Sequence, residues 1–121
     1  NIMALAKVGL TTVTRVGTST TSTVYTVSSA KTAYIRSVVV HNVDSTNSST
    51  VKIHIVPVSG GGVGTASSLN QLAQLTIQPV DTYFFELAYP ITLSTNNDTI
   101  QIANTSASAS INILILGDRE A

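Results

Sequence analysis

Short runs of β-branched and aromatic residues alternate along this chain with clusters of Ser, Thr, Asn and Gly. The run 51–55, Val-Lys-Ile-His-Ile, alternates apolar and polar residues with a period of two, which is typical of a strand with one buried face. The polar clusters supply the side chains and backbone freedom that turns need. They lie at 17–23, 44–50, 64–68, 94–99 and 105–110. This pattern predicts an all-β protein.

About eight segments have the composition and periodicity of strands, within 121 residues that suit a single domain. The segment 68–75 also fits one helical turn by its leucine spacing, but the apolar run before Pro79 favours a strand. Pro90 restricts the pairing of the segment before it to a sheet edge. The expected strands are 4–16, 23–28, 32–43, 51–58, 75–77, 82–87, 99–103 and 110–116.

Short strands with such frequent turns indicate one antiparallel β-sandwich with a jelly-roll-like topology. Residues 1–9 are expected to form an N-terminal arm or an edge strand, and residues 10–121 the sandwich domain. The segment 44–50 is expected to be a hairpin loop. In the strand that follows it, alternation predicts that Lys52 and His54 point outward.

Charged residues are scarce and balanced: six basic and six acidic side chains make up 10% of the sequence. A nucleic-acid interface needs clustered Lys and Arg to displace counterions, whereas the basic residues here are scattered singly. No apolar run approaches the roughly 18 residues of a membrane-spanning helix. The sequence has no cysteine, which excludes disulfides and thiolate metal sites. We therefore expect neither nucleic acid nor a membrane as a partner.

No group of residues predicts catalysis, a metal or a cofactor. His41, His54 and Asp44 offer three zinc ligands, but nothing nearby supplies groups to orient them, so two ordinary strand histidines are favoured. The glycine run 60–64 mimics a dinucleotide-binding loop, yet Ser67 stands where a third small residue belongs and no β-α-β pattern follows. Gly-x-Ser-x-Gly is absent as well. We expect no enzyme.

Four tyrosines offer flat apolar rings with polar tips, which suit a sugar-binding face. They are Tyr25, Tyr34, Tyr83 and Tyr89. Because they are spread along the chain and Trp is absent, carbohydrate binding is kept as an alternative hypothesis.

Two stretches resemble the small β-sandwich virion proteins of tailed bacteriophages. In the first, 24–42, a Tyr-Thr-Val opening, a turn and Lys-Thr-Ala lead into a long strand that ends in Asn. In the second, 89–100, Pro-Ile-x-Leu, a turn and Asp-Thr-Ile form a corner. The resemblance covers roughly 10–116 and consists of turn and core residues. It implies the sandwich fold and a structural role in the virion.

Among proteins of this kind, the resemblance points first to a capsid decoration (cement) protein on the virion surface. Its partners are then the major capsid protein or other virion proteins. A homo-oligomer is expected, with a trimer favoured because it matches local three-fold points of an icosahedral shell. A small tail, baseplate or fibre component involved in host attachment is the alternative.

Candidate partner contacts come from apolar residues that are expected to face outward. Alternate apolar positions near the N-terminus fit strand addition to a partner's sheet edge, and equally fit an edge strand of the chain's own sandwich. The run 38–40 is apolar on both faces, so we expect a neighbour or a second subunit to cover its outer side. The candidate contacts are Ala4, Ala6, Val8, Leu10, Phe84 and Tyr89.

Overall fold

The computed structural model describes residues 5–28 and 31–120, and for residues 5–9 it describes the backbone alone. All regular elements in this part of the chain are β-strands, and no helix there is long and apolar enough to cross a membrane. The strands are β1 (Leu5–Gly9), β2 (Thr14–Val16), β3 (Thr20–Thr26), β4 (Ala33–Asn42), β5 (Ser49–Val56), β6 (Gln71–Ile77), β7 (Thr82–Leu93), β8 (Thr99–Asn104) and β9 (Ile111–Glu120).

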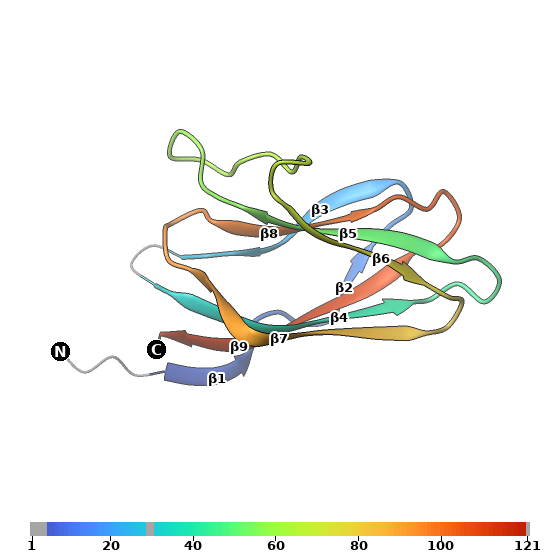
Figure 1. Ribbon diagram of the computed structural model, residues 1–121, viewed down its shortest axis with the longest axis horizontal. Coiled ribbons are helices and arrows are strands. Elements are labelled where there is room, and N and C mark those ends of the chain that lie inside the picture. Colours follow the sequence, from blue (N-terminus) through green and yellow to red (C-terminus); the bar gives the residue numbers. More distant parts are fainter. Residues whose placement is uncertain (1–4, 29–30, 121) are drawn as a thin grey trace.

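The strands form two antiparallel sheets that pack face to face (Figure 1). The first sheet has the order β1-β9-β4-β7, with β2 also paired to β9, and the second has the order β3-β8-β5-β6. Because β1 and β2 follow each other along β9, they act as one interrupted strand. The nested pairs β1/β2–β9, β3–β8, β4–β7 and β5–β6 are those of a jelly roll. The predicted β-sandwich is confirmed.

The core lies between the two sheets and is filled by alternate residues of their strands. In β4, Val38 and Val40 are buried, whereas Val39 between them is half-buried on the outer side. Burying a branched aliphatic side chain stabilises the fold by about 1.5–3 kcal/mol. The largest fully buried side chains are all Ile or Val: Ile35, Ile53, Ile100, Ile102, Ile111, Ile113, Ile115, Val16, Val27, Val38, Val40 and Val51.

The pairing of the strands tests two of the sequence predictions, one for the segment 68–75 and one for the segment before Pro90. The segment with leucine spacing is a strand, because β6 pairs with β5 over most of its length. β7 is the terminal strand of the first sheet, as the position of Pro90 predicts. Along β7, Phe85 and Leu87 pack against the core, whereas Phe84 and Glu86 are exposed.

The segment 44–50 is not a hairpin loop, and that prediction is wrong. β4 belongs to the first sheet and β5 to the second, so this segment carries the chain from one layer to the other. Turn-forming residues mark both kinds of connection equally, which is why the sequence does not distinguish them. Buried Asn42 holds the crossover: its Nδ2 donates to the carbonyl oxygens of Asn47 (2.8 Å) and Ile77 (3.0 Å).

The side chain of Asp44 accepts hydrogen bonds from the backbone of this crossover, and the pKa of its carboxyl group is expected to be sensitive to them. Its Oδ1 accepts the backbone N–H groups of Thr46 and Asn47, both at 2.7 Å. These two bonds lower the pKa of Asp44 below its ordinary 3.8, and the bond from Thr46 has the larger effect. The stabilisation from the carboxylate is then present above pH 3.8 and is lost as the pH falls through the lower pKa of the folded state. NMR titration of the carboxyl carbon checks this, and a midpoint at or above 3.8 contradicts it.

β4 carries one extra residue, Arg36, relative to β9, whereas on its other side residues 87–90 of β7 stand opposite that same residue. At this bulge the backbone of β4 comes unusually close to β9. A Cβ atom placed on Gly117 would overlap the carbonyl oxygen of Tyr34, so this position of β9 accepts only glycine without movement of the strands.

Candidate docking surface

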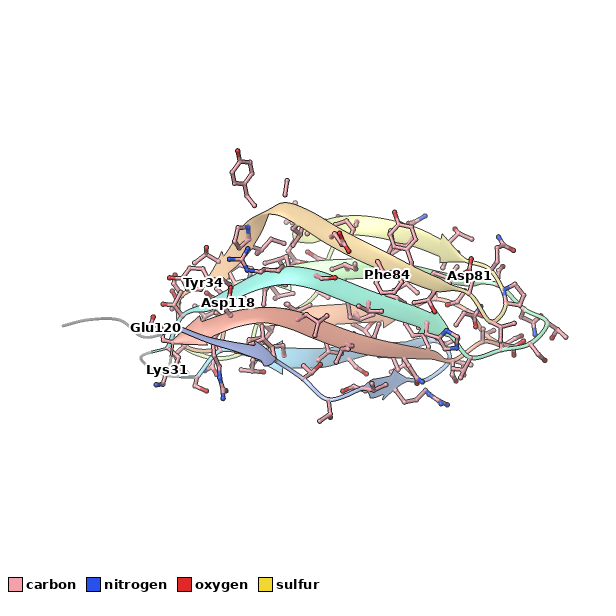
Figure 2. The ribbon with its side chains drawn as sticks, turned by 90° about the horizontal axis from the view of Figure 1, so that it is seen from below. Lys31, Tyr34, Asp81, Phe84, Asp118 and Glu120 are labelled. Atoms are coloured by element: carbon pink, nitrogen blue, oxygen red, sulfur yellow. The ribbon has the colours of Figure 1, made fainter. Side chains whose placement is uncertain are left out.

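An apolar row crosses three strands on the outer face of the first sheet, the side turned away from the second sheet. Phe84 of β7 pairs with Val39 of β4, which pairs in turn with Leu114 of β9. Directly opposed residues of antiparallel strands share a face, with Cβ atoms about 5 Å apart. Phe84 is 62% exposed, and the other two are half-buried. Figure 2 looks onto this face and labels Phe84.

A polar row lies beside the apolar row, two residues further along each strand. It consists of Thr82, His41, Asn112 and Arg15, from β7, β4, β9 and β2. His41 Nδ1 is hydrogen-bonded to Thr82 Oγ1 at 2.9 Å, and Arg15 Nε donates to Asn112 Oδ1 at 2.6 Å. An apolar centre with a hydrogen-bonded polar border is the arrangement found at protein interfaces.

An ion pair lies toward the other end of the first sheet. Arg36 Nε donates to Asp118 Oδ2 at 2.6 Å; the Asp118 side chain is 5% exposed and that of Arg36 58%. Asp118 is paired in register with Tyr34, and Figure 2 labels both. Because Arg36 is largely in solvent, the pair contributes about 1 kcal/mol or less. No local pattern predicts this ion pair, since its two residues are 82 positions apart.

β7 leaves the ladder between Glu86 and Ile91 and then pairs with β4 again. Its register against β4 jumps from Glu86 to Ile91, so residues 87–90 bulge out. Tyr89 lies in this bulge and is 86% exposed. The two aromatic residues predicted as partner contacts, Phe84 and Tyr89, therefore lie on one edge strand.

The N-terminal candidate contacts that the structure describes lie at the opposite edge of the same sheet. Ala4 is outside the described residues, and for Ala6 and Val8 only the backbone is described. β1 is paired with β9 along its whole length, as an edge strand of the chain's own sandwich. Leu10 is half-buried against the core and donates its N–H to Ile115 O at 2.9 Å. The predicted contacts thus fall at two edges, separated by β9 and β4.

The two histidines lie in different sheets, so they do not flank a common hairpin. His54 is 5% exposed, and the prediction that it points into solvent is wrong because the connection 57–70 covers it. Its Nδ1 is hydrogen-bonded to Asn70 Oδ1 at 3.0 Å and Ser67 O at 3.1 Å. His41 and His54 do not meet at a metal site, and the described residues contain no cluster of three or more metal-ligating side chains.

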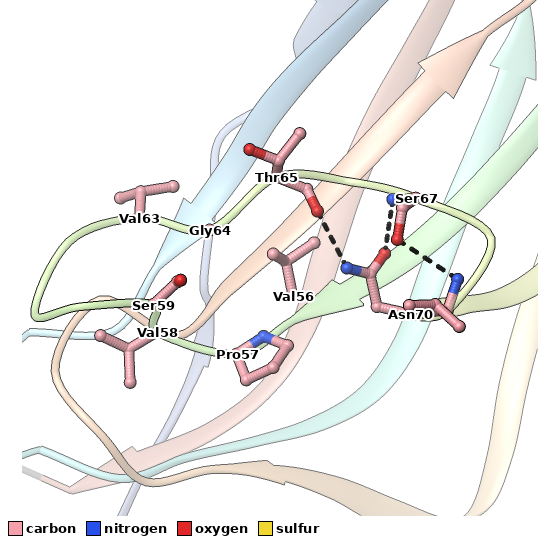
Figure 3. A pocket seen from close by; sticks show the side chains of 10 residues that line it. Val56, Pro57, Val58, Ser59, Val63, Gly64, Thr65, Ser67 and Asn70 are labelled. Atoms are coloured by element: carbon pink, nitrogen blue, oxygen red, sulfur yellow. Dashed lines mark hydrogen bonds between the residues drawn. The ribbon is translucent and has the colours of Figure 1, made fainter.

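The glycine-rich connection between β5 and β6 frames an open pocket of about 510 Å³ (Figure 3). Asn70 fixes its wall: Nδ2 donates to Thr65 O at 3.0 Å, and Oδ1 accepts the Ser67 N–H at 2.9 Å. The connection leads into strand β6, whereas a dinucleotide loop leads into a helix whose N-terminus holds the phosphates. The polar groups of Asn70 are therefore used to shape the loop.

The four tyrosines do not share one face. Tyr25 is in β3 of the second sheet, Tyr34 is in β4, and Tyr83 and Tyr89 are in β7. Burial raises the pKa of the Tyr25 hydroxyl above its ordinary 10.0, and the charge of Arg119 partly opposes this. Rings distributed over two sheets do not form a common stacking platform for one sugar.

Comparisons of the chain with protein-family models, curated proteins and solved structures found no match. The function is therefore argued from the fold and from the outer face of the first sheet.

Proposed function

We propose that this protein is a non-enzymatic structural protein of a tailed-bacteriophage virion, a capsid decoration protein that binds the major capsid protein on the outer shell. The observation that carries the proposal is the apolar row of Phe84, Val39 and Leu114 with its polar border. An aromatic side chain that is 62% exposed beside half-buried aliphatic residues is typical of a contact that a partner covers.

The fold and composition support the same role. Jelly rolls serve as viral capsid and lectin domains, although a fold by itself does not determine a function. Formal charges balance to zero at pH 7, and Ser and Thr fill the connections. Such a surface avoids long-range repulsion between many copies on one shell.

A decoration protein stabilises a shell because its binding energy exists only in the assembled state. Each contact can be weak when many copies, or several sites per oligomer, bind together. The outer face of the first sheet suits this, since it is broad and is bordered by paired polar side chains.

Copy number in purified virions tests the location. Quantitative mass spectrometry against the major capsid protein is expected to give about one copy per one to three capsid subunits, the ratio of a shell lattice. A few to a few dozen copies per particle would contradict decoration and indicate the tail, where host attachment is the leading role.

Variants on β7 test the docking face. Tyr89→Asp and Phe84→Asp are each expected to lower the occupancy of virions by about tenfold or more, because each removes an aromatic contact and adds a charge that must be desolvated. Leu69→Asp is the matched control: Leu69 is 97% exposed but lies on the pocket loop. Equal occupancy for all three variants would contradict docking through this face.

A further inference from the structure

The first half of β7 is a regular strand, and none of the described residues pairs with its outer edge. It is the last strand in its sheet, and Thr82 to Glu86 pair with β4 on one side only. The sequence there, Thr-Tyr-Phe-Phe-Glu, has strong β-propensity and lacks the Pro, Lys or bulge that usually protects a free edge. The protecting bulge and Pro90 begin only after it.

The direction of the backbone groups follows from one hydrogen bond. Asn42 donates its N–H to Asp81 O at 3.0 Å, which continues the register of His41 with Thr82. Hydrogen-bonded and non-hydrogen-bonded pairs alternate in an antiparallel ladder. Tyr83 and Phe85 therefore direct their backbone groups toward β4.

The intervening residues, Thr82, Phe84 and Glu86, direct their backbone groups toward the free edge. The Thr82 N–H agrees with this, since it donates to the carboxylate Oδ1 of Asp81 at 2.9 Å and not to β4. The remaining backbone N–H and C=O groups on this edge can form hydrogen bonds with another strand.

This edge is complementary to itself. An antiparallel pairing centred on Phe84 sets Phe84 opposite its own copy and Glu86 opposite Thr82. Each Glu86 carboxylate then lies at the near end of the other copy's polar row, opposite Thr82 and one strand from His41, and this row contains no acidic side chain.

Other registers of the antiparallel β7–β7 pairing are less favourable. Centring on Glu86 opposes two carboxylates, which is destabilising. Centring on Tyr83 runs into the turn at Val80, where φ is +57°, and centring on Phe85 runs into the bulge at 87–90. The pairing centred on Phe84 keeps all three outward-directed residues within the regular segment.

We infer that two copies of this chain associate through antiparallel β7–β7 pairing with a two-fold axis at Phe84. The pairing forms about four new backbone hydrogen bonds, with the Thr82 N–H still held by Asp81. It joins the two first sheets into one and merges the two apolar rows into a continuous stripe on a shared outer face. This self-association does not depend on the proposed virion role.

Cysteine cross-linking of the isolated protein tests this contact, because the natural chain has no cysteine. In a hydrogen-bonded antiparallel pair the Cα atoms are about 5.5 Å apart, within the range of a disulfide. Phe84→Cys is expected to form covalent dimers under mild oxidation at least about tenfold faster than Leu69→Cys, a control at a more exposed position. Equal rates would overturn the proposal.

Sedimentation velocity of the unmodified chain, from about 10 μM to 1 mM, is expected to show a monomer–dimer equilibrium. Phe84→Pro is expected to abolish the dimer while keeping the fold, because the N–H it removes points away from β4. Phe84→Ala retains that N–H and should still dimerise, though more weakly. A trimer, or a dimer that persists in folded Phe84→Pro protein, would overturn the inference; circular dichroism establishes that each variant is folded.

Discussion

A Gly117→Ala variant is expected to lose about 3 kcal/mol or more of its free energy of unfolding. The added methyl group would overlap the carbonyl oxygen of Tyr34 and approach the backbone nitrogen of Arg36. Both atoms belong to β4, which is hydrogen-bonded on both sides and cannot move without weakening two ladders at once. Urea unfolding followed by circular dichroism measures the loss, which is a large fraction of the about 5–15 kcal/mol that stabilises a typical domain.

Gly17→Ala is the matched control for this effect. A Cβ atom on Gly17 would meet only Thr20 Oγ1, at an ordinary 3.8 Å, and the backbone there does not have positive φ. Its stability is expected to stay within about 1 kcal/mol of the parent protein. Unfolding of the two alanine variants at the same urea concentration would contradict the close approach of β4 to β9.

Asn104→Asp is expected to destabilise the fold by about 3–5 kcal/mol at neutral pH. Asn104 is 1% exposed, and its Nδ2 donates to the carbonyl oxygens of Gly17 (3.0 Å) and Ala109 (2.7 Å). Its Oδ1 accepts the Ser49 hydroxyl at 2.7 Å. The substitution keeps the shape but sets a buried carboxylate oxygen against two carbonyl oxygens.

The pH dependence of this loss distinguishes repulsion from a change in packing. Burial and the two carbonyls favour the protonated carboxyl, so the pKa at residue 104 in the variant is raised on folding. A raised folded-state pKa makes the stability deficit shrink as the pH falls. Asn96→Asp, in an exposed turn, is expected to be nearly neutral at all pH values. A pH-independent loss at residue 104 would contradict the explanation.

The strands were predictable from the sequence because each depends on local periodicity. The β-branched run 38–40, apolar on both faces, and the apolar run before Pro79 both indicated the correct element. Local periodicity does not predict which of the two sheets a strand belongs to. Whether 44–50 turns back on its own strand or crosses to the other sheet depends on pairings with β7 and β8, which lie far along the chain.

The candidate surface was predictable only in part, for the same reason. Phe84 could be named because it occupies an outward position of the expected strand 82–87, where an aromatic residue is unusual. The residues beside Phe84, Val39 and Leu114, become neighbours only through the register. His54 was misjudged because a connection 13 to 16 residues further on folds back over it.

During synthesis, β1 and β2 leave the ribosome before the other seven strands of the sandwich, but their common partner β9 leaves after all of them. Until residues 111–120 are available, β4 has β7 as its only neighbour, and the first sheet lacks one of its two central strands. Folding is therefore expected to be late and slow, on the order of milliseconds to seconds, as for other proteins dominated by non-local pairing. Throughout that interval the edge of β7 is exposed on a partly formed sheet, so rapid production of the chain is expected to favour aggregation through β7 before the native sandwich closes.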